Sequence, residues 1–485
     1  MKFQYLFITK KLVQTAVFVF AAVMVCLGVY AREVNDPKKI WPDPDLSYIW
    51  RSGGPVKARF ALSQDKVLVH SDGLVYMQVD LEADDQERPL LKKRTPTDFV
   101  IVLDRSGSMS GRNKMTFAQK AIESLLWQIG EEDRFALVAF DDMVETPIAL
   151  RTMTSKNREE LLSSIQSISP RGSTNLGAGL IEGMNILKNA GRVSGHAQRL
   201  ILISDGMANE GITDVAELGR MAGGAVQHEF IISTIGVGLD FNETLLSSVA
   251  DHGTGSYYFL EDVAQLDKIL SEEFYGASRV LARNIVLKLD LASGFSVEEA
   301  SGYPISQRGG AVLVQAGSLY EQQKKTFFVT LKVPTSAVYT EALGDVDLSY
   351  EANGTSYTVA LTRPGLTIAC LPLEKKEEVK RSVDQEIFTN AWTKNNYGLL
   401  LKASGGQVAS GNLVGAKSSV QEYKNKLQEA YEVAPSPAIA NQISELGTLE
   451  KEMDHSFTGA DSEEKQKRLS KKLHFEGGKE QRVVK

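Results

Sequence analysis

Five short and continuously apolar runs constrain the fold of this 485-residue chain more than any other feature. Each run is bounded by Gly, Asp or Ser, and the runs comprise Phe99–Leu103, Phe135–Phe140, Leu200–Ile203, Phe230–Val237 and Tyr257–Leu260. Apolar runs of this length without polar alternation are typical of strands that are buried on both faces. They predict a sheet that is covered on its two sides.

The segments between these runs carry apolar residues every three or four positions, as one face of a helix requires. The first such stripe comprises Met115, Ala118, Ile122, Leu125 and Ile129. Comparable stripes begin at Leu161, Leu176, Val215 and Val263. This alternation predicts an α/β domain over residues 97–276, with a doubly wound and mostly parallel sheet. Val144–Leu150 follows Phe140 too closely for a crossover, which predicts a hairpin and one antiparallel edge strand.

The sequence on either side of this domain alternates with period two, which is typical of half-buried strands. Alternating positions include Val75, Met77, Val79 and Leu81 before the domain, and Ile285, Leu287, Leu289 and Leu291 after it. We expect residues 45–95 and 280–372 to share one β-sandwich with the α/β domain inserted in it, because the ends of such a domain usually lie close together. Helical stripes follow over residues 374–457, with one helix expected to end before Gly405-Gly406, and the charged residues 458–485 are expected to be loose.

The residues at the N-terminus have the pattern of an export signal. Three lysines precede a largely apolar run, Ala16–Tyr30, which is followed by Ala31. This order predicts that residues 1–31 form a signal peptide cleaved after Ala31. The alternative is an uncleaved membrane anchor, since Leu12–Tyr30 is nearly long enough to span a bilayer. Both alternatives place the rest of the chain outside the cytoplasm, as a periplasmic, cell-surface or secreted protein.

The composition is that of a soluble globular protein, with 43% hydrophobic residues and a formal net charge of −7. This balance argues against nucleic acid as the main partner, because phosphate contacts need clustered Lys and Arg. Contact with a membrane is expected only through the N-terminal segment, if it is not cleaved.

Oxygen-bearing side chains gather where strands of the predicted sheet end. Asp104, Ser106 and Ser108 follow the run Phe99–Leu103 directly, Asp205 follows Leu200–Ile203, and Thr174 lies in a loop that opens a helix. The carboxyl ends of parallel strands face one crevice, so we expect these five residues to bind one divalent metal there. Two carboxylates and three hydroxyls suit Mg²⁺, which prefers oxygen ligands and retains waters. Mn²⁺ fits the same oxygens, and Ca²⁺ is a further possibility.

The DxSxS, GxTN and SDG motifs together resemble the metal-ion-dependent adhesion site of von Willebrand factor type A domains, and the surrounding phrases resemble exported bacterial members of that family. All five positions of the motif are matched. The resemblance implies direct ligation by Ser106 and Ser108, direct or water-mediated ligation by Asp104 and Asp205, and direct ligation by Thr174 when a partner is bound. It also implies that a protein partner offers an Asp or Glu side chain to complete the coordination.

The leading interpretation is therefore a metal-dependent binding module for adhesion or scaffolding at the cell envelope, and not an enzyme. A metal-dependent hydrolase is the weaker alternative. A phosphotransferase of the haloacid dehalogenase type needs a second Asp where Ser106 stands, and an apparent serine-hydrolase elbow has Met109 at its centre. A non-catalytic subunit of a channel-like or chelatase-like membrane complex is a further alternative.

Other polar and aromatic residues have less specific interpretations. Asp141-Asp142 predicts a hairpin turn, with a role behind the metal ligands or towards a partner as the alternative. Asn209-Glu210 predicts an exposed loop, or else part of the ligand surface. Trp392 and Tyr397 predict core anchors of the helical region, with peptide capture as the alternative.

Overall fold

The computed structural model describes residues 48–484, with gaps at 53, 84–94, 191–195, 261–264, 278, 322, 353 and 362–365. The predicted signal peptide or anchor of residues 1–31 lies outside the described residues. Within them, no helix combines the length and the apolar character that crossing a bilayer requires.

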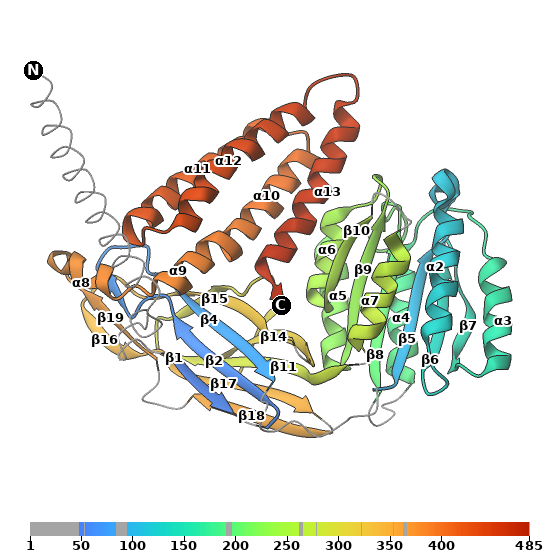
Figure 1. Ribbon diagram of the computed structural model, residues 1–485, viewed down its shortest axis with the longest axis horizontal. Coiled ribbons are helices and arrows are strands. Elements are labelled where there is room, and N and C mark those ends of the chain that lie inside the picture. The colour runs from blue at the N-terminus through green and yellow to red at the C-terminus, as the bar shows by residue number, and fades with distance from the viewer. Residues whose placement is uncertain are drawn as a thin grey trace, which may run out of the picture. The chain divides into compact units, whose positions relative to one another are not determined.

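The central sheet of the α/β domain has the strand order β10-β9-β8-β5-β6-β7 (Figure 1). Its strands are β5 (Thr97–Asp104), β6 (Arg134–Phe140), β7 (Val144–Thr152), β8 (Ala197–Ser204), β9 (Phe230–Val237) and β10 (Thr254–Leu260). Neighbouring strands pair in parallel, except that β7 runs antiparallel to β6. The predicted antiparallel edge strand is confirmed.

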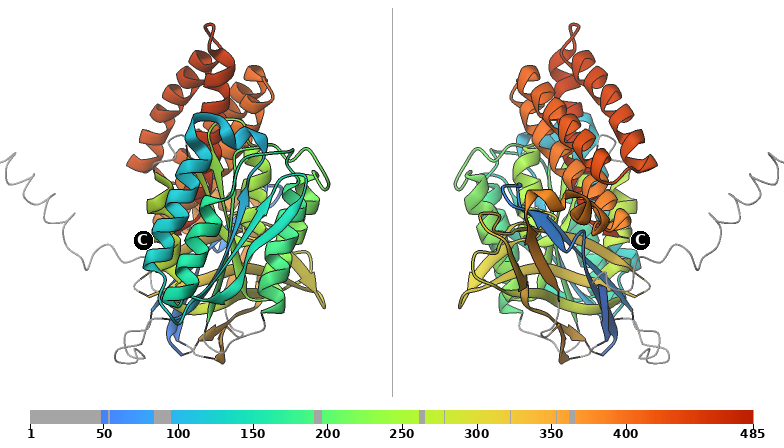
Figure 2. Two further views of the ribbon diagram at one scale, coloured as in Figure 1. Left: turned by 90° about the vertical axis from the view of Figure 1, so that its right-hand side faces the viewer. Right: turned by 90° about the vertical axis from the view of Figure 1, so that its left-hand side faces the viewer.

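Helices cover both faces of this sheet, as the view from its β7 edge shows (Figure 2, left). One face packs against α2 (Lys114–Gln128), α3 (Ser155–Gln166) and α7 (Leu266–Ala277). The other packs against α4 (Leu176–Asn189), α5 (Val215–Gln227) and α6 (Glu243–His252). Successive residues of β5 alternate between the two cores, so Ile101 lies in one and Val102 in the other. Every position from Phe99 to Leu103 is therefore apolar.

Two sheets of the β-sandwich enclose a separate core. The first has the order β1-β2-β4-β15-β12 and comprises β1 (Tyr48–Ser52), β2 (Val56–Leu62), β4 (Leu74–Ala83), β15 (Lys325–Lys332) and β12 (Ser296–Glu299). The second has the order β13-β14-β11-β17-β18 and comprises β13 (Ile305–Arg308), β14 (Ala311–Tyr320), β11 (Val280–Leu291), β17 (Gly344–Ala352) and β18 (Thr355–Leu361). A small sheet joins β16 (Tyr339–Ala342), β19 (Thr367–Leu371) and β3 (Lys66–Leu68).

Strand β4 precedes the α/β domain in the chain, and β15 follows it, yet the two pair antiparallel over their lengths, for example Met77 opposite Val329. The strands before and after the α/β domain therefore share one sheet. The predicted fold class is confirmed: a doubly wound α/β domain inserted in a β-sandwich and followed by a helical region.

The helical region begins with η4 (Leu373–Lys375) and ends in a two-residue strand, β20 (Val483–Val484), that pairs with β15. Between them lie α8 (Lys376–Arg381), α9 (Gln385–Asn390), the π-helix η5 (Ala391–Asn396), α10 (Tyr397–Ala409), α11 (Leu413–Val433), α12 (Pro437–Ser456) and α13 (Ser462–Gln481).

Two expectations for this region are wrong. Residues 458–485 are not loose, because α13 occupies most of them and buries Leu469 and Leu473 against the other helices. Gly405-Gly406 does not end a helix, since α10 continues to Ala409. One physical reason explains both: α10 and α13 approach closely through small residues. A Cβ on Gly477 would lie 2.7 Å from the Gly398 carbonyl oxygen. Such packing leaves little apolar signal in the sequence.

A buried ion pair fastens α13 to the α/β domain. Lys471 Nζ lies 3.0 Å from Glu243 Oε2 of α6, and the two side chains are 3% and 8% exposed. Ser470 Oγ also donates to the Glu243 carboxylate, and Lys471 stands over the Phe241 ring. Removing one partner of such a pair leaves an uncompensated buried charge.

We predict that Lys471→Met lowers the free energy of unfolding by about 3 kcal/mol, because the Glu243 carboxylate is left buried without its cation. The measurement is urea denaturation followed by circular dichroism. The matched control is Lys472→Met, because Lys472 is 43% exposed and pairs with Glu452 on the surface. We expect the control to change stability by less than about 1 kcal/mol. Equal losses in both variants would contradict the prediction.

Candidate metal centre

Three loops meet at the carboxyl-terminal edge of the central sheet. Backbone hydrogen bonds join the loop after β5 to the loop before α4: Arg171 N donates to Arg105 O over 2.7 Å, and Gly107 N donates to Gly172 O over 3.1 Å. The loop after β6 is tied in by Arg105 N, which donates to Phe140 O over 2.8 Å. The loops that carry Asp104, Ser106, Ser108 and Thr174 are thus joined by backbone hydrogen bonds.

Four of the five predicted site residues are connected to one another by hydrogen bonds of their hydroxyl, carboxylate and backbone amide groups. Ser106 Oγ lies 3.0 Å from Ser108 Oγ, and Ser108 Oγ donates to Asp205 Oδ1 over 2.8 Å. Asp104 Oδ1 accepts from Ser106 N over 2.8 Å, and Asp104 Oδ2 accepts from Ser204 Oγ over 2.5 Å. Residues that are about a hundred positions apart in the chain are therefore neighbours here.

Thr174 joins this group across Gly206. A Cβ on Gly206 would lie 3.0 Å from Thr174 Oγ1 and 3.5 Å from Asp104 Oδ2. A glycine at this position lets the threonine hydroxyl and the carboxylate approach the same space. Asn209 fixes the threonine backbone, because Asn209 Oδ1 accepts from Thr174 N over 2.9 Å. All five predicted residues are therefore brought together.

The group is buried on one side and open on the other. Asp104, Ser106, Thr174 and Asp205 are buried, whereas Ser108 is exposed. Burial raises the pKa of the Asp104 carboxyl to about 6, in the same direction as the nearby Asp205 charge and against hydrogen bonds from Ser204 and Ser106. A cation at this position would favour the ionised form of the carboxyl.

Lys114 is a member of the site that the sequence did not reveal. It is the first residue of α2, is 7% exposed, and pairs its ammonium group with Asp205 Oδ2. The 3₁₀ segment η2 (Gly107–Asn113) leads into it, and Arg112 and Asn113 have positive φ values of 51° and 58°. This left-handed entry is uncommon for residues other than glycine. It turns the chain so that α2 starts with its lysine at the site.

Asp141 has a larger role than the predicted hairpin turn. It does form the turn, since its Oδ1 accepts from Met143 N over 2.7 Å. Its other oxygen accepts from Arg105 Nε over 2.9 Å and from Arg171 Nε over 2.7 Å, and the carboxylate is fully buried. Although burial opposes it, hydrogen bonds from Arg171 and the Met143 amide, together with the Arg105 charge, lower the pKa of Asp141. Asp141 therefore anchors two of the loops that carry site residues.

Asn209 and Glu210 are exposed, as the loop interpretation requires, but both contact the loop of Thr174. Asn209 binds Thr174, and Glu210 Oε2 accepts from Ser173 Oγ over 2.6 Å. Both residues therefore help to position the loop that carries Thr174, and a role in the ligand surface stays a prediction. Within the described ranges, no group of three or more His, Cys, Asp or Glu side chains has a metal-binding arrangement, and the candidate centre itself combines two carboxylates with hydroxyl groups.

Comparison with known proteins identifies the α/β domain. Residues 98–272 match the family model of the von Willebrand factor type A domain. Among solved structures, the von Willebrand factor type A protein from Catenulispora acidiphila is similar over 90% of this chain and 98% of its own, with a TM-score of 0.64 and 16% identity. The ArnB paralog VWA2 from Sulfolobus acidocaldarius is similar over 87% and 98%, with a TM-score of 0.57 and 19% identity. At these identities the likeness shows the fold alone.

Curated relatives match mainly in part. The uncharacterized protein YfbK of Escherichia coli strain K12 is 27% identical over 223 residues, which are 46% of this chain and 38% of YfbK. The uncharacterized protein sll0103 of Synechocystis is 23% identical over 66% of this chain and 74% of its own length. The inter-alpha-trypsin inhibitor heavy chain H1 of Bos taurus is 29% identical over 34% of this chain and 18% of its own.

Proposed function

We propose that this chain, which contains a von Willebrand factor type A domain, is a metal-dependent protein-binding module that captures an acidic side chain of a partner. One observation carries the proposal: hydroxyl and carboxylate oxygens from three separated loops converge at one edge of the sheet. Bringing these groups together in a partly buried position is costly unless something compensates their charge and dipoles. A divalent cation does so.

The donor set fits Mg²⁺. The hydroxyls of Ser106, Ser108 and Thr174 and the carboxylates of Asp104 and Asp205 would hold it, with Mn²⁺ or Ca²⁺ as substitutes. When bound, the ion would offer a coordination position to an incoming carboxylate oxygen.

Charge supports the acidic partner. Lys114 neutralises one of the two site carboxylates, so the protein supplies only one net negative charge to the ion. A divalent cation bound there retains a net positive charge, which attracts a partner's Asp or Glu.

The rim of the site suits a protein surface. Met143 is 62% exposed in the turn after β6, and Met207 is 59% exposed in the loop after β8. Both loops border the candidate ligands. In the turn after β6, Asp141 O accepts from the backbone N–H of Asn175, next to Thr174, and in the loop after β8, Gly206 lies against the Thr174 hydroxyl. Methionine side chains adapt to varied apolar surfaces, so these two could pack against a partner around the metal.

The two serine hydroxyls of the site contact other candidate ligands. Ser106 Oγ contacts Ser108 Oγ, and Ser108 Oγ donates to Asp205. Among the described residues, neither serine hydroxyl is hydrogen-bonded to a histidine or a lysine.

We further propose that the protein is exported and acts at the cell envelope. The support is the N-terminal order of lysines, apolar run and Ala31 in the sequence. Fractionation of the producing cells, followed by N-terminal sequencing of the purified protein, tests this. A chain recovered from the cytoplasm with its first residues intact would exclude export.

The experiment for partner binding uses the immobilised chain and an envelope extract. We expect a partner that is retained in Mg²⁺, released by a chelator, and lost when the bait carries Thr174→Ala. The matched control is Thr340→Ala, which alters an exposed threonine of β16 in the sandwich. Retention that persists in chelator, or equal loss with Thr340→Ala, would contradict a metal-bridged contact.

A further inference from the structure

Residues 238–242 form a linking loop between β9 and the start of α6, at the same edge of the sheet as the candidate metal centre. The loop is packed against the domain, since Leu239 is 8% exposed and Phe241 is 3% exposed. Its first amide is also fixed, because Gly238 N donates to Leu260 O over 2.8 Å. The linking loop therefore has a defined position beside the site.

The start of the linking loop contacts the lysine of the site. A Cβ on Gly238 would lie 3.2 Å from Lys114 Cε and 3.5 Å from Lys114 Nζ, so the Gly238 backbone forms a wall beside the end of this side chain. The ammonium group itself is bonded to Asp205 Oδ2. A divalent cation that takes Asp205 as a ligand must displace the ammonium, because two cations repel each other at one carboxylate. The position of Gly238 therefore limits where the displaced ammonium can go.

Helix α13 fastens the other end of the linking loop. Lys467 Nζ lies 3.3 Å from Asp240 Oδ1. Lys471 Nζ lies 3.0 Å from Glu243 Oε2, where α6 begins, and 4.5 Å from the centroid of the Phe241 ring. Because Lys467 and Lys471 are four residues apart, both project from one face of α13. These contacts of the two lysines are the α13 clamp.

Ion pairs join the helical region to the α/β domain. Lys402 and Arg482 both pair with Asp251 near the end of α6, in addition to the α13 clamp at its start. Among the described residues, the apolar core of the helical region shares no member with the two apolar cores of the α/β domain. Units that meet without a large hydrophobic interface are expected to move relative to each other. The α13 clamp is therefore a contact that can open while the cores stay intact.

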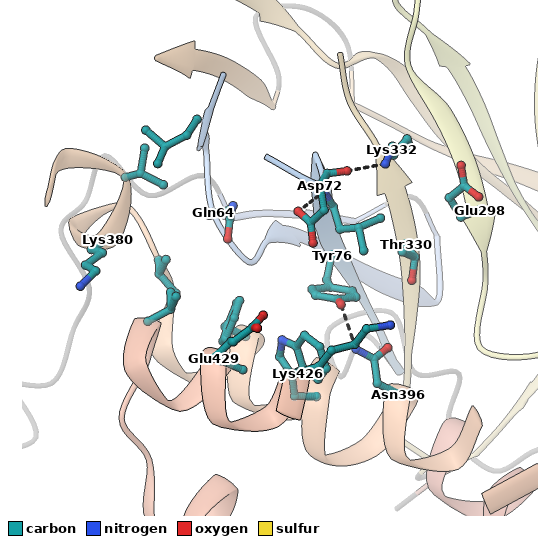
Figure 3. Close-up of a pocket in the computed structure, with 18 of the residues that line it drawn as sticks. Gln64, Asp72, Tyr76, Glu298, Thr330, Lys332, Lys380, Asn396, Lys426 and Glu429 are labelled. Atoms are coloured by element: carbon teal, nitrogen blue, oxygen red, sulfur yellow. Dashed lines mark hydrogen bonds between the residues drawn. The ribbon is translucent and has the colours of Figure 1, made fainter. Parts of the chain in front are cut away.

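Open space lies on both sides of the helical region. Towards the α/β domain, a cavity of about 310 Å³ is lined by Arg112 of η2, by Leu239 and Asp240, and by residues around the start of α13. Towards the sandwich, a cavity of about 750 Å³ lies between β4 and β15 on one side and α8, α9, η5 and α11 on the other (Figure 3). Figure 3 shows Tyr76 and Asn396 meeting there, where Asn396 Nδ2 donates to Tyr76 Oη over 2.8 Å. Protein interiors are close-packed, so cavities of this size mark interfaces that have room to rearrange.

We infer that α13 restrains the candidate metal centre through the linking loop. With the α13 clamp closed, Gly238 keeps the Lys114 ammonium on Asp205, and the affinity of the site for a divalent cation is low. With the clamp open, the loop moves into the adjoining cavity, the ammonium leaves Asp205, and the affinity rises. Because coupling between two equilibria is reciprocal, a bound cation also weakens the clamp. This inference rests on the proposed metal-dependent function and adds its regulation.

Isothermal titration calorimetry of the metal-free full chain with Mg²⁺ tests the inference. We expect Lys471→Met, which opens the clamp, to bind Mg²⁺ at least about fivefold more tightly than the wild type. In a Lys114→Met background the same substitution should change the affinity by less than about twofold, because the restrained ammonium is absent. An effect of the unpaired Glu243 charge alone would instead tighten binding equally in both backgrounds. The matched control is Lys472→Met, which leaves the clamp intact and should bind as the wild type does.

A milder variant keeps the test valid if Lys471→Met does not fold. Asp240→Asn removes the exposed partner of Lys467 and leaves no buried charge without its partner. It should bind Mg²⁺ more tightly than the wild type, although the loss of a negative charge would by itself weaken cation binding. Circular dichroism melting establishes which variants are folded at the temperature of the titration.

Hydrogen exchange followed by mass spectrometry gives a second readout, which reports on α13 and not on the metal. In the wild type, added Mg²⁺ should increase the exchange of the backbone amides around Lys467 and Lys471, because a bound cation weakens the clamp. Lys114→Met should show a smaller change, since no ammonium has to be displaced there.

Three results would overturn the inference and leave the metal site standing. The folded variants among Lys471→Met and Asp240→Asn could bind Mg²⁺ no more tightly than the wild type. The gain in Lys471→Met could persist undiminished in the Lys114→Met background. Saturating Mg²⁺ could leave the exchange in α13 unchanged or slow it. A wild type that binds no Mg²⁺ would instead remove the proposed metal site and the inference together.

Discussion

Replacing Asp104 with alanine is expected to weaken Mg²⁺ binding by at least about a hundredfold, because the change removes one of two site carboxylates and the acceptor that holds the Ser106 amide and the Ser204 hydroxyl. The side chain is fully buried, so water cannot simply take the place of its two hydrogen bonds in an unchanged loop. Isothermal titration calorimetry of the metal-free protein with Mg²⁺ measures the effect.

The matched control is Asp347→Ala. Asp347 is a half-buried aspartate on β17 of the sandwich, 3.8 Å from Lys288 Nζ, and it is 31% exposed. The substitution removes one aspartate carboxylate outside the α/β domain. We therefore expect Asp347→Ala to bind Mg²⁺ with the affinity of the wild type. Equal affinity in Asp104→Ala and the wild type would refute the proposed metal site, whatever the control shows.

Lys114→Met is expected to change metal binding in the opposite direction. The ammonium group of Lys114 is bonded to Asp205, so it competes with a divalent ion for that carboxylate and repels the ion. Removing one positive charge at this range should tighten Mg²⁺ binding about tenfold or more. In the absence of metal the same variant should lose about 3 kcal/mol of stability, since Asp205 is buried and left without its cation.

Calorimetry and thermal melting with and without Mg²⁺ test both effects. Added Mg²⁺ should recover much of the lost melting temperature in Lys114→Met, because binding to the folded state stabilises it. Lys120→Met is the matched control, as Lys120 lies exposed on the same helix and has no contact with the site. If the wild type binds Mg²⁺ and Lys114→Met binds it no more tightly, the role assigned to Lys114 is wrong while the metal site stands.

The α/β core and the gathering of the five oxygens were predictable from the sequence because both depend on short-range patterns. A run such as Phe99–Leu103 must be covered on both faces, and whatever follows it must lie at the sheet edge. Asp104 and Asp205 lie close together because β5 and β8, which end beside them, are paired in parallel. The position of Thr174 does not follow from strand pairing. Its loop is held by hydrogen bonds, in which Thr174 N donates to Asn209 Oδ1 and Arg171 N donates to Arg105 O.

Lys114 could not be predicted, because its position depends on two left-handed residues, Arg112 and Asn113, whose conformation no sequence pattern indicates. The helix α13 escaped prediction for another reason. Its buried face contains Ser470, Lys471 and Gly477 along with two leucines. Polar and small residues give no apolar periodicity, so this face cannot be told from an exposed one in the sequence.

The insertion of the α/β domain has a mechanical consequence. The chain leaves the sandwich from β4 in one sheet and returns through β11 in the other, so a pull applied at the domain's far edge divides between two tethers. Strand β4, from which the first tether leaves, is paired with β15 along its length. The clamp of α13 adds a third attachment. The α/β domain is therefore held to the rest of the protein by its two chain connections and by the contact of α13 with α6.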